Sequence, residues 1–316
     1  MENNWPMVTV IIPAHPDGSE VKAATVARRL DYPFGKLEII IARGRQPSVQ
    51  RNAALRVARG EIIYFLDDDS LPCPGNLQRS IPLFSQPDVM MVGGPNLCPE
   101  DAPALEQTFA LTMGSWLAFG PSRARYRGIG TTRTSSEKEL ILCNLVARRD
   151  ALLELGGFDE KLYPNEENAL MDNLQKRGGQ LIYDPELIVH RRPRPGWKAF
   201  TKMLLNYGRG RAEQFRMHPT PGSALNFVPP LFCVYLLAAG FLPRIFQFPL
   251  LLYALAVLAQ AAGLLPLAKW IWLPRLMLLI FLSHIFYGLG FWLGLITRLK
   301  KPTSKIAGEV TLENFQ

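Results

Sequence analysis

One stretch of the chain, residues 61–72, constrains the fold more than any other. Five apolar residues, Ile62–Leu66, are followed at once by three consecutive carboxylates, Asp67, Asp68 and Asp69. A continuous apolar run of this length is typical of a parallel strand buried on both faces. Because ligands bind beyond the carboxyl ends of the strands in open α/β sheets, the stretch predicts an α/β fold with a functional site at Asp67.

Three adjacent carboxylates repel one another unless a cation lies among them. Hard divalent cations prefer oxygen ligands, and Mg2+ is usually held by one or two carboxylates together with substrate phosphates. The pattern therefore predicts a divalent-cation site at residues 67–69. The alternative interpretation is a solvated acidic turn that caps the next helix, because aspartate is a good N-cap.

Strand-like and helix-like segments alternate along the first 183 residues. Runs rich in apolar residues predict strands at residues 7–14, 37–42, 62–66, 89–93, 141–148 and 180–183. Apolar residues at helical spacing predict helices at 21–30, 50–59, 105–119, 151–155 and 169–177. This alternation favours a Rossmann-like, mostly parallel sheet with flanking helices.

The chain becomes strongly apolar after residue 224. Hydrophobic residues make up 48% of the sequence and charged residues 20%, and three apolar stretches lie at 227–242, 249–268 and 276–297. The last two approach the ~20 residues that cross a bilayer, whereas the first is shorter and contains Pro229-Pro230. Basic residues precede the first stretch and follow the last, so the positive-inside rule puts both ends in the cytosol and favours a hairpin of two crossings over three.

A basic segment precedes the apolar stretches. It contains Arg191, Arg192, Arg194, Lys198, Lys202, Arg209, Arg211 and Arg216 against one acid, Glu213. Such juxtamembrane clusters are attracted to anionic lipid, so we expect a bilayer as the partner and no nucleic acid. Its apolar residues, among them Trp197, Phe200 and Leu204, recur at helical spacing and predict a helix lying on the membrane surface.

These features predict four regions. They are a catalytic domain at 1–190, a basic interfacial segment at 191–224, transmembrane helices at 225–300 and a cytosolic tail at 301–316. The first six residues lack the pattern of a signal peptide, and the four cysteines include no C-x-x-C pair, which fits a reducing compartment. We therefore expect a protein of the inner membrane whose catalytic domain faces the cytosol.

Five motifs, in order, resemble those of family 2 glycosyltransferases. They are Val-Ile-Ile-Pro-Ala at 10–14, Gln-Arg-Asn-Ala-Ala at 50–54, Phe-Leu-Asp-Asp-Asp at 65–69, Gly-Gly-Phe-Asp-Glu at 156–160 and Asn-Glu-Glu-Asn at 165–168. The resemblance covers residues 7–216 and implies the GT-A fold and a nucleotide-sugar donor. The apolar C-terminal part is similar to members that extend lipid-linked saccharides for surface glycans, which implies a polyprenyl-linked acceptor.

The resemblance also implies roles for the acidic cluster. Asp67 and Asp69 match the two ends of the family's D-x-D motif, with Asp69 on a Mg2+ or Mn2+ ion and Asp67 toward both the metal and the ribose. Asp68 between them is either a further nucleotide contact or a spare turn residue. His190 follows a strand-like run and is a candidate third metal ligand, although a single histidine is more often structural.

Further candidates for donor binding lie near the first and second strands. The motifs imply Pro13, Ala14, Arg51 and Asn52; for the last two the alternative is ordinary helix surface. Where the family usually has an aspartate for uracil, this chain has the run Ala-Arg-Gly-Arg-Gln-Pro at 42–47. Base contacts from Asp17 or Glu20 are expected instead.

An acid on the acceptor side would act as the general base of the reaction. Glu167 aligns with the family's base, Glu166 is the competing choice, and Ala169 stands where a second acid often lies. Two adjacent acids near a metal–diphosphate can have one pKa raised toward the working pH, as a general base needs. Alternatively, both glutamates cap the helix that starts near residue 169.

The Gln-x-x-Arg-Trp motif of processive synthases is absent, which favours the addition of one sugar per encounter. Arg209 and Arg211 stand in the comparable region, where they would hold a donor or lipid diphosphate, or else contact lipid headgroups. Three functions remain open. They are an inverting, metal-dependent transferase acting on a lipid-linked saccharide, a polyprenyl-phosphate monosaccharide synthase, and a non-catalytic, membrane-anchored nucleotide-sugar-binding subunit.

Overall fold

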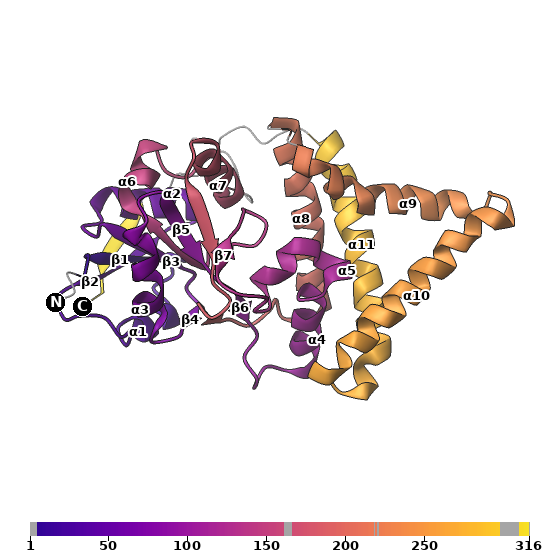
Figure 1. Cartoon of the computed structure of the whole chain (residues 1–316), viewed down its shortest axis with the longest axis horizontal. Coiled ribbons are helices and arrows are strands. Elements are labelled where there is room, and N and C mark those ends of the chain that lie inside the picture. Colours follow the sequence, from indigo (N-terminus) through magenta and orange to yellow (C-terminus); the bar gives the residue numbers. More distant parts are fainter. Residues whose placement is uncertain (1–4, 161–165, 218, 220, 298–309, 316) are drawn as a thin grey trace. The chain divides into compact units, whose positions relative to one another are not determined.

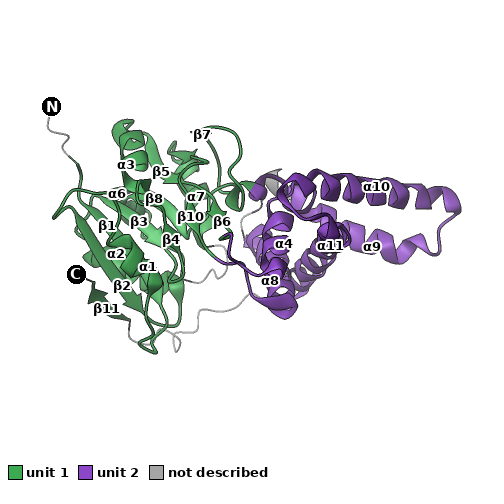
Figure 2. Ribbon diagram, turned by 90° about the horizontal axis from the view of Figure 1, so that it is seen from below, with its two compact units in different colours: residues 1–99, 124–191, 300–316 green, residues 100–123, 192–299 purple. Residues whose placement is uncertain are grey.

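The computed structural model describes residues 5–160, 166–217, 219, 221–297 and 310–315. They form two compact units (Figure 2), which we call the sheet unit (residues 1–99, 124–191 and 300–316) and the helical unit (residues 100–123 and 192–299). This division differs from the predicted regions in two places. Residues 100–123 belong with the C-terminal helices, and the end of the chain returns to the sheet unit instead of forming a separate tail.

The sheet unit contains an eight-stranded sheet in the order β11-β2-β1-β3-β8-β5-β9-β7. Figure 1 labels β1, β2, β3, β5 and β7 of this sheet. The strands are β1 (Val8–Ala14), β2 (Leu37–Arg43), β3 (Ile62–Leu66), β5 (Val89–Gly93), β7 (Arg133–Thr134), β8 (Asn144–Arg148), β9 (Gln180–Tyr183) and β11 (Thr311–Asn314). Strands β1, β2, β3, β5 and β9 run in one direction, and β7, β8 and β11 run against them. The predicted mostly parallel α/β sheet is confirmed, although β8, within the predicted strand 141–148, is antiparallel.

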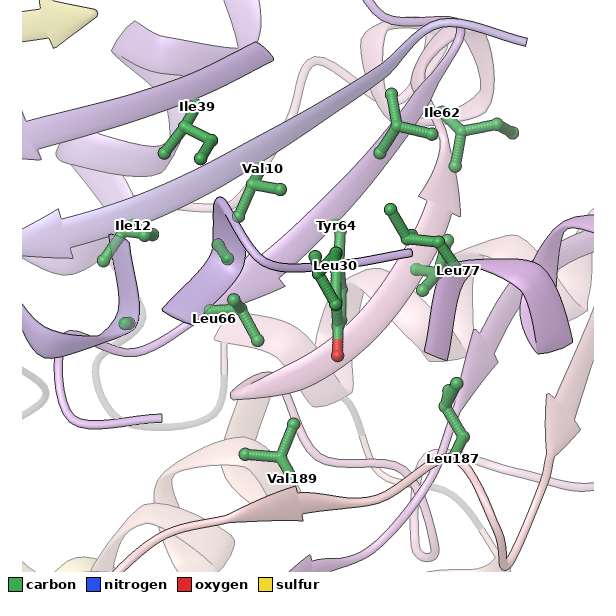
Figure 3. Packing of buried hydrophobic residues seen from close by; sticks show 14 of the residues in the cluster. Val10, Ile12, Leu30, Ile39, Ile62, Tyr64, Leu66, Leu77, Leu187 and Val189 are labelled. Atoms are coloured by element: carbon green, nitrogen blue, oxygen red, sulfur yellow. The ribbon is translucent and has the colours of Figure 1, made fainter. Parts of the chain in front are cut away.

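Alternating side chains of the central strands build two cores, one on each face of the sheet. Val10, Ile12, Tyr64 and Leu66 point to one face (Figure 3), where helices α1 (Lys22–Ala27) and α3 (Asn76–Ser80) cover them. The residues between them, such as Ile11 and Phe65, point to the other face, which α2 (Pro47–Val57), α6 (Arg149–Glu154) and α7 (Glu166–Lys176) cover. A continuous apolar run is therefore required of each buried strand, because both of its faces are covered.

A second, three-stranded sheet lies within the same unit. Strand β10 (Val189–His190) lies between β4 (Leu71–Pro72) and β6 (Asn96–Leu97), antiparallel to the former and parallel to the latter. A buried polar network ties it to the main sheet, because Asn144 accepts a hydrogen bond from the Tyr64 hydroxyl (2.9 Å) and donates one to the Leu187 carbonyl (2.6 Å). The segment before β10 is thereby held close to the carboxyl end of β3.

The helical unit is organised around α11 (Leu273–Ile296). Helices α8 (Gly196–Met217), α9 (Val228–Ala239), α10 (Phe248–Gly263), α4 (Ala104–Met113) and α5 (Trp116–Phe119) pack on it. The predicted helix 105–119 is broken between α4 and α5 at Gly114–Ser115. Helix α8 approaches α11 closely, because a Cβ atom added at Gly208 or Gly290 would lie about 2 Å from a backbone oxygen of the other helix (2.0 Å and 2.1 Å).

The apolar face of α8 is covered by protein. Phe200 and Leu204 are buried, and the Phe200 ring stacks on the Phe109 ring of α4 with a centroid distance of 4.0 Å. The sequence predicted that this face lies on a membrane surface. That prediction is wrong for Phe200 and Leu204, since a helical apolar stripe packs equally well on another helix, and the segment 104–119 that provides the covering surface is distant in the sequence.

Two helical segments, Arg244–Leu267 and Trp270–Ile296, are long and apolar enough to cross a membrane, and a shorter apolar helix, Ala224–Ala239, precedes them. Most of their residues are not buried inside the unit, as expected of helices that face lipid. Within α11, His284 hydrogen-bonds the Tyr253 hydroxyl and the Leu117 carbonyl, each at 2.8 Å. His284 is therefore a satisfied residue at a helix interface, as the sequence predicted.

Candidate functional site

The three consecutive carboxylates lie directly beyond the carboxyl end of β3. The turn that holds them is closed by two hydrogen bonds between Asp67 and Ser70, one from the Asp67 amide to the Ser70 hydroxyl (3.2 Å) and one from the Ser70 amide to the Asp67 carbonyl (3.0 Å). Burial and the neighbouring charges of Asp69 and Asp67 raise the pKa of Asp68. The cluster therefore concentrates negative charge at the edge of the sheet where ligands bind in α/β folds.

Arg191 lies among these carboxylates. Its guanidinium bridges two of them, with Nη1 3.0 Å from Asp67 Oδ2 and Nε donating to Asp69 Oδ1. The Arg191 side chain is 16% exposed. Burial disfavours its charged form, but Asp67, Cys143 and Asp69 act against burial, and the pKa of Arg191 is raised well above its usual value. The sequence assigned Arg191 to the basic cluster that faces lipid. That prediction is wrong for Arg191, because Arg191 neutralises the acidic turn.

Arg51 is the second arginine of the site. Arg51 lies in α2, and its guanidinium contacts Asp67 (Nη2 to Oδ1, 2.9 Å) and Glu166 of α7 (Nη1 to Oε1, 3.3 Å). Both Arg51 and Glu166 are buried, and neither Arg51 Nε nor Glu166 Oε2 has a hydrogen-bond partner among the described residues. Arg51 therefore joins the predicted acidic cluster to the predicted catalytic acids, and it is not helix surface.

The two candidate bases differ in their surroundings. Glu166 is 3% exposed, whereas Glu167 is half-buried. Burial and the adjacent Glu167 charge raise the pKa of Glu166 to about 7, against the lowering effect of Arg51. Glu167 is the more accessible of the two to an incoming acceptor, and Glu166 is the one tied to Arg51. Residues 161–165, including Asn165 of the motif, lie outside the described residues.

The side chain of Asn52, which was predicted to bind the nucleotide together with Arg51, hydrogen-bonds residues of the Gly-Gly-Phe-Asp-Glu motif. The Asn52 side chain accepts a hydrogen bond from the Phe158 amide (2.8 Å) and donates to the Phe158 carbonyl (2.9 Å) and to Glu160 Oε1 (2.9 Å). Gly157 has φ +82°, and a Cβ atom there would lie 2.4 Å from Asn52 Oδ1. The motif at 50–54 therefore packs against the motif at 156–160 and is hydrogen-bonded to it. A contact between Asn52 and the nucleotide remains a prediction.

The carboxyl ends of β1 and β2 carry the remaining donor-binding candidates of this unit. Pro13 and Ala14 are buried in β1, and Glu20 is exposed in the loop that follows. Arg43, at the end of β2, donates to the carbonyls of His15 (3.2 Å) and Ser19 (3.3 Å) and thus spans that loop. The loop of Asp17 and Glu20 is therefore held by Arg43, and base contacts from Asp17 or Glu20 remain a prediction.

The residues of the acidic turn fit a divalent cation by the chemistry of their donors. Asp67 and Asp69 offer carboxylate oxygens from one short turn, and Mg2+ and Mn2+ prefer such ligands. His190 lies in β10, one residue before Arg191. In the part of the chain that the structure describes, no group of three or more His, Cys, Asp and Glu side chains is arranged to hold a metal ion. The predicted role of His190 stays a prediction.

Arg209 and Arg211 belong to the helical unit. Arg209 lies 3.5 Å from Glu213, one turn further along α8, and Arg211 donates to Gln214 (3.0 Å). Arg192 in the same unit makes two hydrogen bonds of 2.7 Å to the buried Glu106 of α4. It was expected to face lipid headgroups; it instead neutralises a buried acid. The diphosphate-binding roles of Arg209 and Arg211 remain predictions.

The family described as glycosyltransferase like family 2 matches residues 2–206, about two thirds of the chain. The chain belongs to this family. The resemblance carried by the five motifs is confirmed.

Relatives and solved structures agree with the family. The chain is 27% identical over 190 residues to a pre-mycofactocin glycosyltransferase of Mycobacterium tuberculosis, an alignment that covers 55% of this chain and 36% of the relative. It is 22% identical to cellulose synthase 2 of Novacetimonas hansenii, over 91% of this chain and 19% of the relative. The chain thus spans about a third or less of the length of these relatives.

A solved mannosyltransferase of Pyrobaculum calidifontis, PcManGT in complex with GDP-Man and Mn2+, superposes with a TM-score of 0.57 at 18% identity, over 90% of this chain and 87% of that one. This likeness confirms the predicted GT-A fold.

Sequence reasoning missed two charged residues that the structure brings to the candidate site and its surroundings, Arg191 and Glu313. Arg191 was counted with the other basic residues of 191–216, although the need of three adjacent acids for a cation was a signal that one nearby arginine belongs to them. Glu313 was placed in a tail, whereas β11 brings it to Arg43. Short strands such as β11 carry little periodicity, so no comparable signal was available for Glu313.

Proposed function

We propose that this protein is an inverting, metal-dependent glycosyltransferase that moves a sugar from a nucleotide-sugar donor to a hydroxyl group of a lipid-linked saccharide. The observation that carries the proposal is the arrangement at the end of β3, where Asp67 is shared by Arg51 and Arg191 and Arg51 continues to Glu166. Carboxylates that would bind a cation, arginines that would bind a diphosphate and a glutamate beside the proposed general base are thus connected by ion pairs.

Each residue of the site has a proposed role in binding the donor. Asp69 and Asp67 would hold Mg2+ or Mn2+, and a bound divalent cation supplies Lewis-acid stabilisation of the diphosphate leaving group. Arg51 fixes the Asp67 carboxylate through a contact of 2.9 Å. Pro13, Ala14 and the loop of Glu20 line the edge of β1 where the nucleoside would bind, and Asp68 and Asn52 are further candidates for that contact.

Glu167 is the proposed general base. The acceptor oxygen forms its bond to the anomeric carbon as the bond from that carbon to the diphosphate breaks, and the acceptor proton passes to the Glu167 carboxylate. A single displacement of this kind inverts the anomeric configuration. Glu166 is too buried to take the proton directly, and it acts through its ion pair with Arg51.

Membrane attachment is the second part of the proposal. The chain leaves the sheet unit after Arg191 and returns to it as β11, so both ends of the apolar region lie on the side of the membrane that holds the sheet. This placement supports an even number of crossings. The two long helical segments, Arg244–Leu267 and Trp270–Ile296, supply a hairpin of two crossings, with α9 not crossing. We place the sheet unit in the cytosol, at the inner membrane, where basic residues flank the apolar region.

The proposal is tested by donor turnover in membranes that contain the protein. A panel of UDP-, GDP- and dTDP-sugars is supplied with Mg2+ or Mn2+, and nucleotide release and sugar transfer to extracted lipid are measured. We expect one donor to be used, with activity lost in Asp69→Ala and kept in Asp31→Asn, an exposed aspartate after α1. Metal-dependent binding of a donor without any transfer would favour the non-catalytic subunit instead.

A further inference from the structure

Arg191 has a fixed backbone beside the acidic turn. In the antiparallel pairing of β10 with β4, His190 lies opposite Leu71, so Arg191 continues along the strand past Ser70 toward Asp69. The Arg191 amide donates to the Leu97 carbonyl of β6 (2.9 Å), which extends the three-stranded sheet by one bond. The three-stranded sheet therefore fixes the Arg191 backbone next to the acidic turn, within reach of the Asp67 and Asp69 carboxylates.

The guanidinium uses the oxygens that a divalent cation needs. It bridges Asp67 Oδ2 and Asp69 Oδ1, one oxygen from each end of the D-x-D motif, while Arg51 takes the other oxygen of Asp67. Two cations that share the same carboxylates repel each other strongly in a partly buried site. Metal binding and the Arg191 bridge therefore oppose each other.

A nucleoside diphosphate offers Arg191 another partner. Arginine binds phosphate oxygens through two parallel hydrogen bonds, as it binds carboxylates. If the diphosphate takes Arg191, Asp69 is released for the metal, and each ligand then favours the binding of the other, as linkage requires. A lysine would serve less well as the bridge, because its ammonium is a point charge without the planar fork.

We propose that Arg191 is an internal counter-ion that holds Asp67 and Asp69 in the donor-free enzyme and makes metal binding depend on the donor's diphosphate. This inference rests on the proposed function, because it takes the metal and the diphosphate as ligands of this site. It assigns Arg191 as a positioning residue that prevents the acidic turn from binding free metal in the absence of nucleotide.

Binding of Mn2+ to the full chain, followed by electron paramagnetic resonance of the free ion, tests the inference without turnover. The protein is purified in detergent, and Mn2+ is titrated alone and with saturating GDP or UDP. For the wild type we expect weak binding of Mn2+ alone and tightening by a nucleoside diphosphate within the roughly 5- to 150-fold range of typical couplings. For Arg191→Gln we expect tighter binding of Mn2+ alone and a smaller coupling than in the wild type, because only the direct ligation of Mn2+ by the diphosphate is left.

Two further variants sharpen the result. Arg194→Gln removes the same charge from an exposed position three residues away and should leave both the Mn2+ affinity and the coupling unchanged. Arg191→Lys keeps the charge but not the fork, and we expect an intermediate coupling; it also replaces Arg191→Gln if that variant does not fold, as judged by thermal unfolding.

The outcomes separate the inference from the function on which it rests. Unchanged or weaker Mn2+ binding by Arg191→Gln and Arg191→Lys, with coupling retained, would overturn the counter-ion role and leave the proposed transferase intact. Absence of Mn2+ binding by the wild type and both Arg191 variants, with either nucleotide, would overturn the metal-dependent function and the inference together.

Discussion

Arg43 and Glu313 form an ion pair of 2.7 Å although 270 positions separate them in the sequence. Glu313 lies in β11, which pairs antiparallel with β2, so the last residues of the chain form an edge of the sheet. The Arg43 side chain is 13% exposed and also donates to the loop after β1. The end of the chain, beyond the apolar helices, thus supports the part of the sheet unit where the nucleoside of the donor is expected.

Substitution of Glu313 by Gln should lower stability modestly. The partner Arg43 is mostly buried but Glu313 is 43% exposed, so we expect a loss on the order of 1 kcal/mol in the free energy of unfolding. Because the freed Arg43 holds the loop of Glu20 less firmly, the KM for the donor should rise more than kcat falls. Thermal unfolding and steady-state kinetics measure both effects, with Glu154→Gln, an exposed acid of α6, as the control. An equal change in both variants would show that the ion pair is unimportant.

Substitution of Asn52 by Ala should be strongly destabilising. It removes three hydrogen bonds to Phe158 and Glu160 and leaves the buried amide and carbonyl of Phe158 unsatisfied. We expect a loss of about 2–4 kcal/mol, measured by denaturant unfolding of the purified protein. Gly157→Ala should also destabilise, since its Cβ would clash with Asn52 and its φ is +82°.

A double variant separates the two causes. In Asn52→Ala/Gly157→Ala the clash is relieved, so the combined loss should be smaller than the sum of the two single losses. Full additivity would mean that the contact between the two motifs does not determine the stability of this loop. A normal unfolding free energy in Asn52→Ala with weakened nucleotide binding would support the nucleotide role predicted from the sequence.

The pH dependence of stability should reflect Glu166. Its pKa is raised from the ordinary value of 4.5 to about 7 in the folded protein, chiefly by burial. The folded state therefore holds the proton more tightly than the unfolded state, and stability falls as the pH rises from about 4.5 to about 7 and then levels. Glu166→Gln removes this proton equilibrium. The variant should gain stability relative to the wild type over that range, on the order of 3 kcal/mol by pH 8.

Thermal unfolding of wild type and Glu166→Gln between pH 4.5 and 8 measures this difference. Other groups that titrate are common to both proteins and cancel in it. A constant difference across the range would show that Glu166 is ionised throughout, held in that state by Arg51.

The acceptor determines how much Glu167 matters. With a hydroxyl acceptor, Glu167→Gln should lower kcat by roughly 10²- to 10⁴-fold, because the general base is lost. With a polyprenyl phosphate, which is already an anion, the same variant should be only weakly impaired. Transfer assays with both acceptor types distinguish a lipid-linked saccharide transferase from a polyprenyl-phosphate monosaccharide synthase. Mn2+ and nucleotide binding should be unchanged in the variant, which controls for folding.

The helix hairpin predicts the sidedness of two positions. If α10 and α11 each cross the membrane, exposed Lys269 in the connection between them lies on the side opposite the sheet unit, whereas Glu154 of α6 lies on the same side as the sheet. In a cysteine-free background, Lys269→Cys should react with an impermeant maleimide in intact cells, and Glu154→Cys should react only after lysis. Protection of both positions until lysis would mean that the two helices do not cross.

The physics of burial explains what the sequence determined by itself. A strand covered on both faces must be apolar throughout, so β1, β2 and β3 were readable as continuous runs, and the acids after Leu66 marked the carboxyl edge of the sheet. The two long apolar helices were equally evident, because each requires a run of about 20 predominantly apolar residues, which is visible in the sequence. These features depend on residues that are adjacent in the sequence, so they can be predicted from the sequence alone.

Only the tertiary structure decided which charges meet. Arg191 lies 122 positions from Asp69, and their contact follows from the register of β10 on β4. A strand of two residues has too short a pattern for this register to be predicted from the sequence. The same holds for the ion pair of Glu313 with Arg43, which depends on the pairing of an edge strand that follows the long apolar helices. An ion pair needs two side chains within a few ångströms but no particular spacing in the sequence. The fold brings the partners together. The sequence alone does not distinguish the arginine of 191–216 that pairs with the acidic turn from the others.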